Sequence, residues 1–409
     1  MIQLSKKILI IDDSALMRRV ISDIINQNND YEVAAIARDG LEGFDLIVSN
    51  PNLYSAIILD INMPKMNGLE LLEKLQKNHI EQTVIVVSTV AKEGAKETIK
   101  ALEFGAFDFV TKPENYLETK GDIFKNKLYD MLNLATATRA SIQRTNQGSS
   151  SRTSGGNTST FTRRTRTTGS NAAGSRKPVS SNGSERGNLD ALIELRKRNT
   201  VMDQMASKVD PRSYTGIKTG RKKLVALACS TGGPKSLQHV VPMLPKNLDA
   251  GVVIVQHMPK GFTLSLAQRL NEISDVKVKE AADGDVIAKG CVYIAPGGKH
   301  IRIERNTIRL SEEPAIDGLR PCANVMYESL ERSDYDEITC VVLTGMGADG
   351  TKGIKGLASS SRNIHVIAQD EDTCVVYGMP RAIAQAGLVD EVVPLNDVAA
   401  TITKNVGVS

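Results

Sequence analysis

Short apolar runs alternate with longer amphipathic stretches through the first 135 residues of the chain. The runs read KILIID, YEVAAI, SAIILD, TVIVVS and FDFV. Between them, stretches that begin near Ser14, Leu41, Leu69 and Glu93 repeat their apolar positions with the period of a helix. Apolar strands joined by helices are typical of a parallel sheet covered on both faces. The pattern predicts an α/β domain over residues 1–135 with five parallel strands.

This alternation disappears over residues 136–187, where Ser, Thr, Gly, Asn and Arg dominate. Such a composition buries too little apolar surface to offset the entropy of an ordered chain, so we expect a disordered linker. Apolar positions return with helical spacing from Leu189 to Val209. They predict a single helix within residues 188–210 that docks on a domain or a partner.

A second alternating region occupies residues 218–407. Its strand-like runs are KLVALAC, GVVIVQH, KVKEA, CVYIAP, ITCVVLT, HVIAQD and VDEVVP. Helices are expected from Pro234, from Phe262, around 325–331, after Gly350 and near Pro380. A hairpin-like insertion is expected near residues 291–311, where CVYIAP is followed by HIRIE and TIRLS. We therefore expect a second doubly wound, mostly parallel α/β domain.

Composition and charge limit which class of protein can contain these domains. The 409 residues exceed what one hydrophobic core normally organises, and the net charge of +4 is small. The first apolar run is too short for a secretion signal, and no run approaches the ~18 residues of a membrane span. The five cysteines lack metal-binding spacing, which favours reduced thiols in a cytoplasmic protein. The Arg-rich linker contains a single aromatic residue, Phe161, so we expect neither nucleic-acid binding nor membrane insertion.

Polar residues with phosphoryl-transfer chemistry stand at the strand ends of the first domain. Asp12 and Asp13 follow the first run, and Asp60 closes the third. Because the carboxyl ends of parallel strands meet at one edge, these carboxylates would converge there, where Mg²⁺ would offset their repulsion. Asp60 would then accept a phosphoryl group whose oxygens contact Lys112 and the Ser88 hydroxyl. Asp12 alone is better explained as a turn or cap residue, so the prediction depends on the whole set.

The segments IIDDSALMRR, AIILDINMPKMNGLELLEKL, VIVVST and GAFDFVTKP resemble the receiver domain of response regulators. The resemblance implies a flavodoxin-like fold in which Asp60 is phosphorylated and Asp12 and Asp13 help to hold Mg²⁺. The switch residues that it implies are Ser88, Phe109 and Lys112. A buried strand residue explains Phe109 equally well.

Ser230 stands in LACSTGGP, between a strand-like run and a helix that begins at Pro234. The intervening glycines leave backbone N–H groups near Ser230 that could stabilise an oxyanion. A phosphate-binding P-loop is excluded because the GxxxxGK[ST] arrangement is absent. A nucleophilic serine needs a base and an orienting acid, and His257 and Asp349 follow two other strands at the same predicted edge. Cys229 should face the opposite side of the strand from Ser230.

These residue types predict the chemistry of a Ser-His-Asp triad. Ser230 would attack a carbonyl, His257 would carry the proton, and Asp349 would fix the imidazole tautomer. The expected oxyanion donors are the backbone N–H groups of Thr231 and Met346. The chain order and the missing GxSxG elbow exclude an α/β-hydrolase. His300 is the second candidate for the base, and the weaker candidates are His79, His239 and His365.

Six segments of the second domain, in family order, resemble the catalytic domain of chemotaxis protein-glutamate methylesterases. They are LACSTGGP, VQHMPKGFTLSLAQRL, EAADGD, YIAPGGKH, LTGMGADGTKGIKGL and AQDEDTCVVYGMPRAI. The resemblance implies hydrolysis of glutamate γ-methyl esters on methyl-accepting chemotaxis receptors, and deamidation of receptor glutamines, with no cofactor for ester hydrolysis. Three residues depart from the family's usual pattern, namely Cys229, Cys322 and Asn324.

A regulatory site and a hydrolytic site in one chain indicate a switch. We expect the unphosphorylated receiver to pack over the catalytic face and phosphorylation of Asp60 by a chemotaxis histidine kinase to release it. The alternatives are a DNA-binding response regulator, which only the basic linker favours, and a non-catalytic scaffold, against which the complete triad argues.

Overall fold

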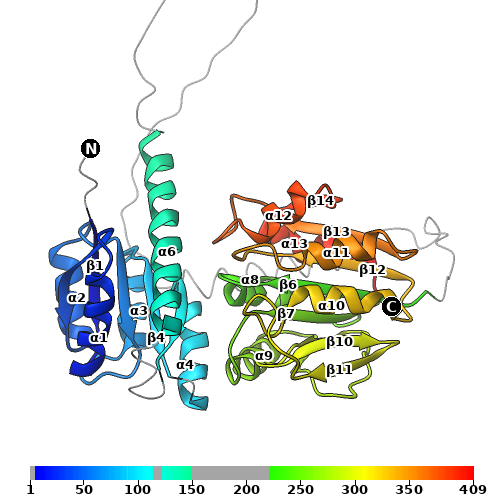
Figure 1. Ribbon diagram of the computed structural model, residues 1–409, viewed down its shortest axis with the longest axis horizontal. Coiled ribbons are helices and arrows are strands. Elements are labelled where there is room, and N and C mark those ends of the chain that lie inside the picture. Colours follow the sequence, from blue (N-terminus) through cyan, green and yellow to red (C-terminus); the bar gives the residue numbers. More distant parts are fainter. Residues whose placement is uncertain (1–4, 90, 114–121, 149–220) are drawn as a thin grey trace, which may run out of the picture. The chain divides into compact units, whose positions relative to one another are not determined.

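The computed structural model describes residues 5–89, 91–113, 122–148 and 221–409, all of which belong to one compact unit. The predicted linker beyond residue 148 and the predicted helix at 188–210 lie outside the described residues. Figure 1 shows two sheets with helices packed on them, one in each predicted domain. No helix among the described residues is long and apolar enough to cross a membrane.

The N-terminal domain has the predicted five-stranded parallel sheet, in the order β2-β1-β3-β4-β5. Its strands are β1 (Lys6–Ile11), β2 (Tyr31–Ala37), β3 (Ala56–Asp60), β4 (Val84–Ser88) and β5 (Asp108–Thr111). Its described helices are α1 (Ala15–Asn26), α2 (Gly40–Ser49), α3 (Gly68–Lys77), α4 (Lys92–Glu103) and α6 (Asp122–Gly148). Alternation along β1 divides the core, because Ile8 and Ile10 pack with α1 and α6 while Leu9 and Ile11 lie with α2, α3 and α4.

The last helix of this domain is longer than the sequence pattern predicted. The prediction ended the domain at residue 135, whereas α6 continues to Gly148. The segment LATATRASIQRTNQ contains no proline or glycine before Gly148, and its Ala, Arg and Gln residues favour a helix even where no apolar stripe is present. The boundary between domain and linker was therefore placed too early.

The C-terminal domain contains a seven-stranded sheet in the order β14-β13-β12-β6-β7-β9-β8, with parallel pairing throughout. Its strands are β6 (Lys223–Cys229), β7 (Gly251–Gln256), β8 (Lys277–Glu280), β9 (Cys291–Ile294), β12 (Glu337–Val342), β13 (Asn363–Gln369) and β14 (Glu391–Val393). The predicted hairpin is a separate antiparallel pair, β10 (His300–Glu304) and β11 (Thr307–Ser311).

Helices cover both faces of this sheet. They are α8 (Gly233–Val240), α9 (Phe262–Ile273), α10 (Ala323–Ser329), α11 (Thr351–Ala358), α12 (Met379–Gln385) and α13 (Val398–Val406). Along β6, Val225 and Leu227 face α8, α9 and α13, whereas Leu224 and Ala226 face α10, α11 and α12. The sequence pattern missed α13, because VAATITKNV is rich in β-branched residues that favour strands.

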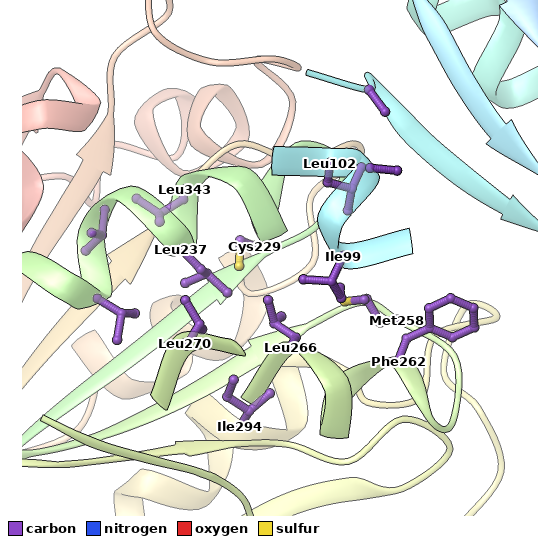
Figure 2. Close-up of a cluster of buried hydrophobic side chains, with 14 of the residues drawn as sticks. Ile99, Leu102, Cys229, Leu237, Met258, Phe262, Leu266, Leu270, Ile294 and Leu343 are labelled. Atoms are coloured by element: carbon purple, nitrogen blue, oxygen red, sulfur yellow. The ribbon is translucent and has the colours of Figure 1, made fainter. Parts of the chain in front are cut away.

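One hydrophobic cluster includes residues of both domains. Ile99 and Leu102 of α4 lie against Leu237, Phe262 and Leu266 of α8 and α9, as Figure 2 shows. The pairing is reinforced by an ion pair in which Arg269 Nε lies 2.5 Å from Glu103 Oε1. Apolar burial and charge pairing thus join α4 to the C-terminal domain.

Candidate functional site

The Ser230 turn joins β6 to α8 and is held by its neighbours on the sheet. The Ser230 N–H donates to Thr344 O at 3.0 Å, and Gly233 N–H donates back to Ser230 O at 2.7 Å. Gly232 has φ of +76°, in the left-handed region that glycine tolerates. A side chain there would also collide with Val375. The sharp turn therefore exposes Ser230 at the carboxyl end of the sheet.

His257 and Asp349 meet as the sequence predicted from their strand ends. His257 Nε2 lies 2.8 Å from Asp349 Oδ2, and both side chains are buried. An ionised carboxylate only accepts, so Nε2–H is the donor and Nδ1 is the nitrogen left for Ser230. Among the described residues no hydrogen bond yet joins the Ser230 hydroxyl to the imidazole, as is common in the absence of substrate.

Asp349 is held as an anion by several donors. Its Oδ2 also accepts from Ala323 N–H at 2.6 Å, and its Oδ1 accepts from Asn324 N–H at 2.9 Å. Burial by itself raises the pKa of Asp349, but His257 and these N–H groups outweigh it and lower the pKa to about 2. Asn324 Oδ1 accepts from Gly350 and Gly353, which anchors the loop carrying Asp349.

Gln256 is a site residue that the sequence analysis missed. Its Nε2 donates to Ser230 O at 3.0 Å and to His257 O at 3.3 Å, and its Oε1 accepts from Cys229 Sγ at 3.0 Å. The available signal was an amide within the otherwise apolar run GVVIVQH. Cys229 faces α8 and α9, and burial raises the pKa of its thiol far above the usual value. It is therefore a packed donor and not a second nucleophile.

A cavity of about 650 Å³ lies beside the triad. It is lined by Ser230, Thr231, His257, Met346 and Asp349, among others. Within the described part of the chain, the N–H groups of Thr231 and Met346 have no protein acceptor, which leaves them available to an oxyanion.

The rival histidines lie in other surroundings. His300 is fully buried in the hairpin, where its Nε2 lies 3.1 Å from Pro314 O. His365 Nε2 lies 2.9 Å from Glu391. None of the four alternatives, which also include His79 and His239, lines the cavity beside Ser230.

The predicted receiver residues also converge. Carboxylate oxygens of Asp12, Asp13 and Asp60 lie within 4.8 Å of one another. Lys112 Nζ lies 2.7 Å from Asp60 Oδ2 and 3.0 Å from Asp12 Oδ2. Asp12 Oδ2 is buried beside this ammonium group, and the three carboxylates together offer the oxygen ligands that a hard cation such as Mg²⁺ prefers. Burial raises the pKa of Asp60, and Lys112 opposes that shift.

Two of the predicted switch residues, Ser88 and Phe109, contact elements that meet the C-terminal domain. The Ser88 hydroxyl donates to Gly94 O at 3.2 Å and so links the end of β4 to α4. The Phe109 ring stacks on Phe262 with centroids 4.6 Å apart. Phe109 therefore packs across the domain boundary and not only within its own core.

Asp108 brings the receiver to the nucleophile turn. It lines the same cavity and contacts the Gly232 N–H and the Thr231 hydroxyl. Burial raises the pKa of Asp108 to about 6, and these donors only partly oppose the rise. A carboxylate of the receiver thus accepts from hydrogen-bond donors on the two residues that follow Ser230.

Comparisons with known proteins match both domains. A model of the CheB methylesterase family matches residues 225–402, and a model of the response regulator receiver domain matches residues 8–120. Protein-glutamate methylesterase/protein-glutamine glutaminase of Bacillus subtilis is 37% identical over 97% of each chain. The protein of the same name from Pyrococcus horikoshii is 35% identical and covers 98% of this chain and 93% of its own.

Solved structures of single domains match in the same way. The Thermotoga maritima CheB methylesterase catalytic domain is 40% identical, covers 45% of this chain and 98% of its own, and has a TM-score of 0.43. The response regulator domain of Thermotoga maritima CheB is 36% identical, covers 33% and 98%, and has a TM-score of 0.30.

Proposed function

The chain belongs to the CheB family of chemotaxis protein-glutamate methylesterases/protein-glutamine glutaminases, and we propose that Ser230, His257 and Asp349 carry out its hydrolysis. The proposed substrates are glutamate γ-methyl esters and selected glutamines of methyl-accepting chemotaxis receptors. The observation that carries the proposal is the buried pair of His257 and Asp349, 2.8 Å apart, beside the same cavity as Ser230.

The proposed mechanism begins when the Ser230 hydroxyl attacks the ester carbonyl and passes its proton to Nδ1 of His257. Asp349 accepts from Nε2–H throughout and stabilises the imidazolium that forms. The oxyanion is bound by the N–H groups of Thr231 and Met346. His257 then protonates the departing methoxide, which leaves as methanol. A water molecule deprotonated by His257 attacks the acyl group, and His257 returns the proton to the Ser230 oxygen as the glutamate carboxylate is released.

In the receiver, Asp60 is the proposed phosphorylation site, with a chemotaxis histidine kinase as phosphodonor. Mg²⁺ held by Asp12, Asp13 and Asp60 would neutralise the phosphoryl oxygens. Lys112, already paired with Asp60, would transfer its contact to the phosphoryl group. No metal is assigned to the ester hydrolysis.

Phosphorylation is proposed to release the receiver from the catalytic face. The supporting contacts are the Phe109–Phe262 stack, the Glu103–Arg269 ion pair and Asp108 at the nucleophile turn. Ser88 is bonded to α4, so its movement toward a phosphoryl group would disturb the helix that packs on the catalytic domain. The switch operates because the unphosphorylated receiver binds the catalytic face more tightly than the phosphorylated one.

The triad is tested by methanol release from methylated receptor membranes. Ser230→Ala should lower the rate on the order of 10⁴-fold, because the nucleophile is lost. The control is Ser236→Ala, whose buried hydroxyl only donates back to Gly232 O within α8. A near-native rate for Ser230→Ala would contradict the assignment of Ser230 as the nucleophile.

The switch is tested by adding a small phosphodonor to the full chain. Asp60→Asn should abolish the stimulation of methanol release while leaving unstimulated activity in place. A single charge reversal at the interface, Glu103→Arg or Arg269→Glu, places like charges together and should raise unstimulated activity by about threefold. The double exchange re-forms the ion pair and should return unstimulated activity to the native level. Full stimulation of Asp60→Asn would show that phosphorylation of another residue controls the activity.

A further inference from the structure

Cys322 touches the acid of the triad. It precedes α10, is almost completely buried, and its Sγ lies 3.1 Å from Asp349 Oδ1. Its side chain makes no hydrogen bond to cap α10; Asp349 instead accepts the first two N–H groups of that helix. Among the described residues, His257 and Cys322 are the side chains that bond this carboxylate.

The direction of this hydrogen bond follows from chemistry. The Asp349 carboxylate can only accept, so the thiol is the donor. Burial, followed by the charge of Asp349, raises the pKa of Cys322 to about 12, so the proton stays on sulfur. A protonated, buried thiol is a poor nucleophile, which leaves donation to Asp349 as its contribution.

We propose that Cys322 is a positioning residue of the triad, whose thiol holds Oδ1 of Asp349. This proposal rests on the proposed function of the triad. Donation to Oδ1 from Cys322, Asn324 and Gly350 fixes the rotation of the carboxylate, so that Oδ2 points at Nε2 of His257.

The consequence is a defined effect of the thiol on the chemical step. Without the thiol, Oδ1 of Asp349 loses one of its three donors, so the hydrogen bond between Oδ2 and Nε2 of His257 should be less well aligned and kcat should fall. KM should change little, because the other residues that line the cavity are unchanged by substitution of Cys322.

The experiment measures kcat and KM for methanol release from methylated receptor membranes by the full chain. Cys322→Ala and Cys322→Val, which cannot donate, should both lower kcat by about fivefold with KM retained. Cys322→Ser keeps a donor and should restore kcat to near the native value.

Cys340→Ala is the matched control, because it removes another fully buried thiol, on β12, that does not contact Asp349. It should lower the melting temperature without lowering kcat. Values of kcat ordered by side-chain volume, or native kcat for both non-donor variants, would overturn the proposal. The Ser230→Ala variant tests the function separately, because a near-native rate there would contradict the triad itself and not the role of Cys322.

Discussion

Gln256 links the proposed nucleophile and the proposed base through one side-chain amide. Its Nε2 donates to the carbonyls of Ser230 and His257, and the Cys229 thiol donates to its Oε1. The thiol fixes which end of the amide faces the carbonyls, because only Oε1 can accept from it. The residue that the family resemblance marked as a departure, Cys229, therefore orients the amide that joins two proposed catalytic residues.

Gln256→Leu should destabilise the protein by about 1–3 kcal/mol, because the His257 carbonyl would lose its donor, and the Ser230 carbonyl and the Cys229 thiol would each lose a hydrogen bond. It should also lower methanol release, since Ser230 and His257 would lose their common anchor. Urea denaturation and initial rates check the two effects. The control is Gln238→Leu, because Gln238 Nε2 is already buried without a partner. Equal losses in both variants would argue against a specific role for Gln256.

At the scale of elements, the first turn of α8 packs against the end of β7 with almost no space between them. A Cβ atom on Gly233 would lie 2.0 Å from Gln256 Oε1 and 3.0 Å from Cys229 Cβ. The glycine is required by this close approach and not by its backbone angles. The position of Ser230 thus depends on how closely a helix can meet a neighbouring strand.

Gly233→Ala should shift the nucleophile turn, lower methanol release by at least about 100-fold, and destabilise the fold by about 1–3 kcal/mol. Gly356→Ala is its counterpart in α11, where a Cβ meets nothing within 4 Å. That change should stabilise the protein by about 0.5–1 kcal/mol through helix propensity, with activity retained. Melting temperatures and rates of the two variants show whether an effect comes from the close packing at Gly233 or from any exchange of glycine for alanine in a helix. An unaffected rate in Gly233→Ala would contradict the close packing.

The sequence predicted the strands and the strand-end residues well, for a physical reason. Apolar runs bounded by turns identify buried parallel strands, and such strands bring Ser230, His257 and Asp349 to one edge. The roles of Gln256 and Cys322 could not be read in the same way. Cys322 bonds a carboxylate 27 residues away, and its direction depends on tertiary packing. α13 was missed because tertiary contacts override its strand-favouring residues.

At the scale of the whole molecule, the receiver contributes a carboxylate to the catalytic site. Burial raises the pKa of Asp108 from its usual 3.8 to about 6 when the domains are in contact. The docked state therefore binds a proton more tightly than the released state. Docking is favoured as the pH falls through 6, and it is opposed above pH 6, where a buried charge must be accommodated.

Asp108→Asn removes that charge and keeps groups able to form hydrogen bonds. At pH 7 and without a phosphodonor, the variant should show about tenfold lower methanol release than the native protein, because its docked state is favoured. The difference should narrow as the pH falls toward 5. Asp130→Asn removes a charge from an exposed position on the same cavity and should change little. A ratio independent of pH would show that Asp108 does not control docking.

The cluster that joins α4 to α8 and α9 has a consequence for temperature. Ile99, Leu102, Phe262 and Leu266 are held together by apolar burial, which weakens on cooling. An ion pair such as Glu103–Arg269 lacks this dependence. A resting state held mainly by that cluster loosens in the cold, so unstimulated demethylation would fall less steeply on cooling than the chemical step alone requires. Cooling would then act on the enzyme in the same direction as phosphorylation.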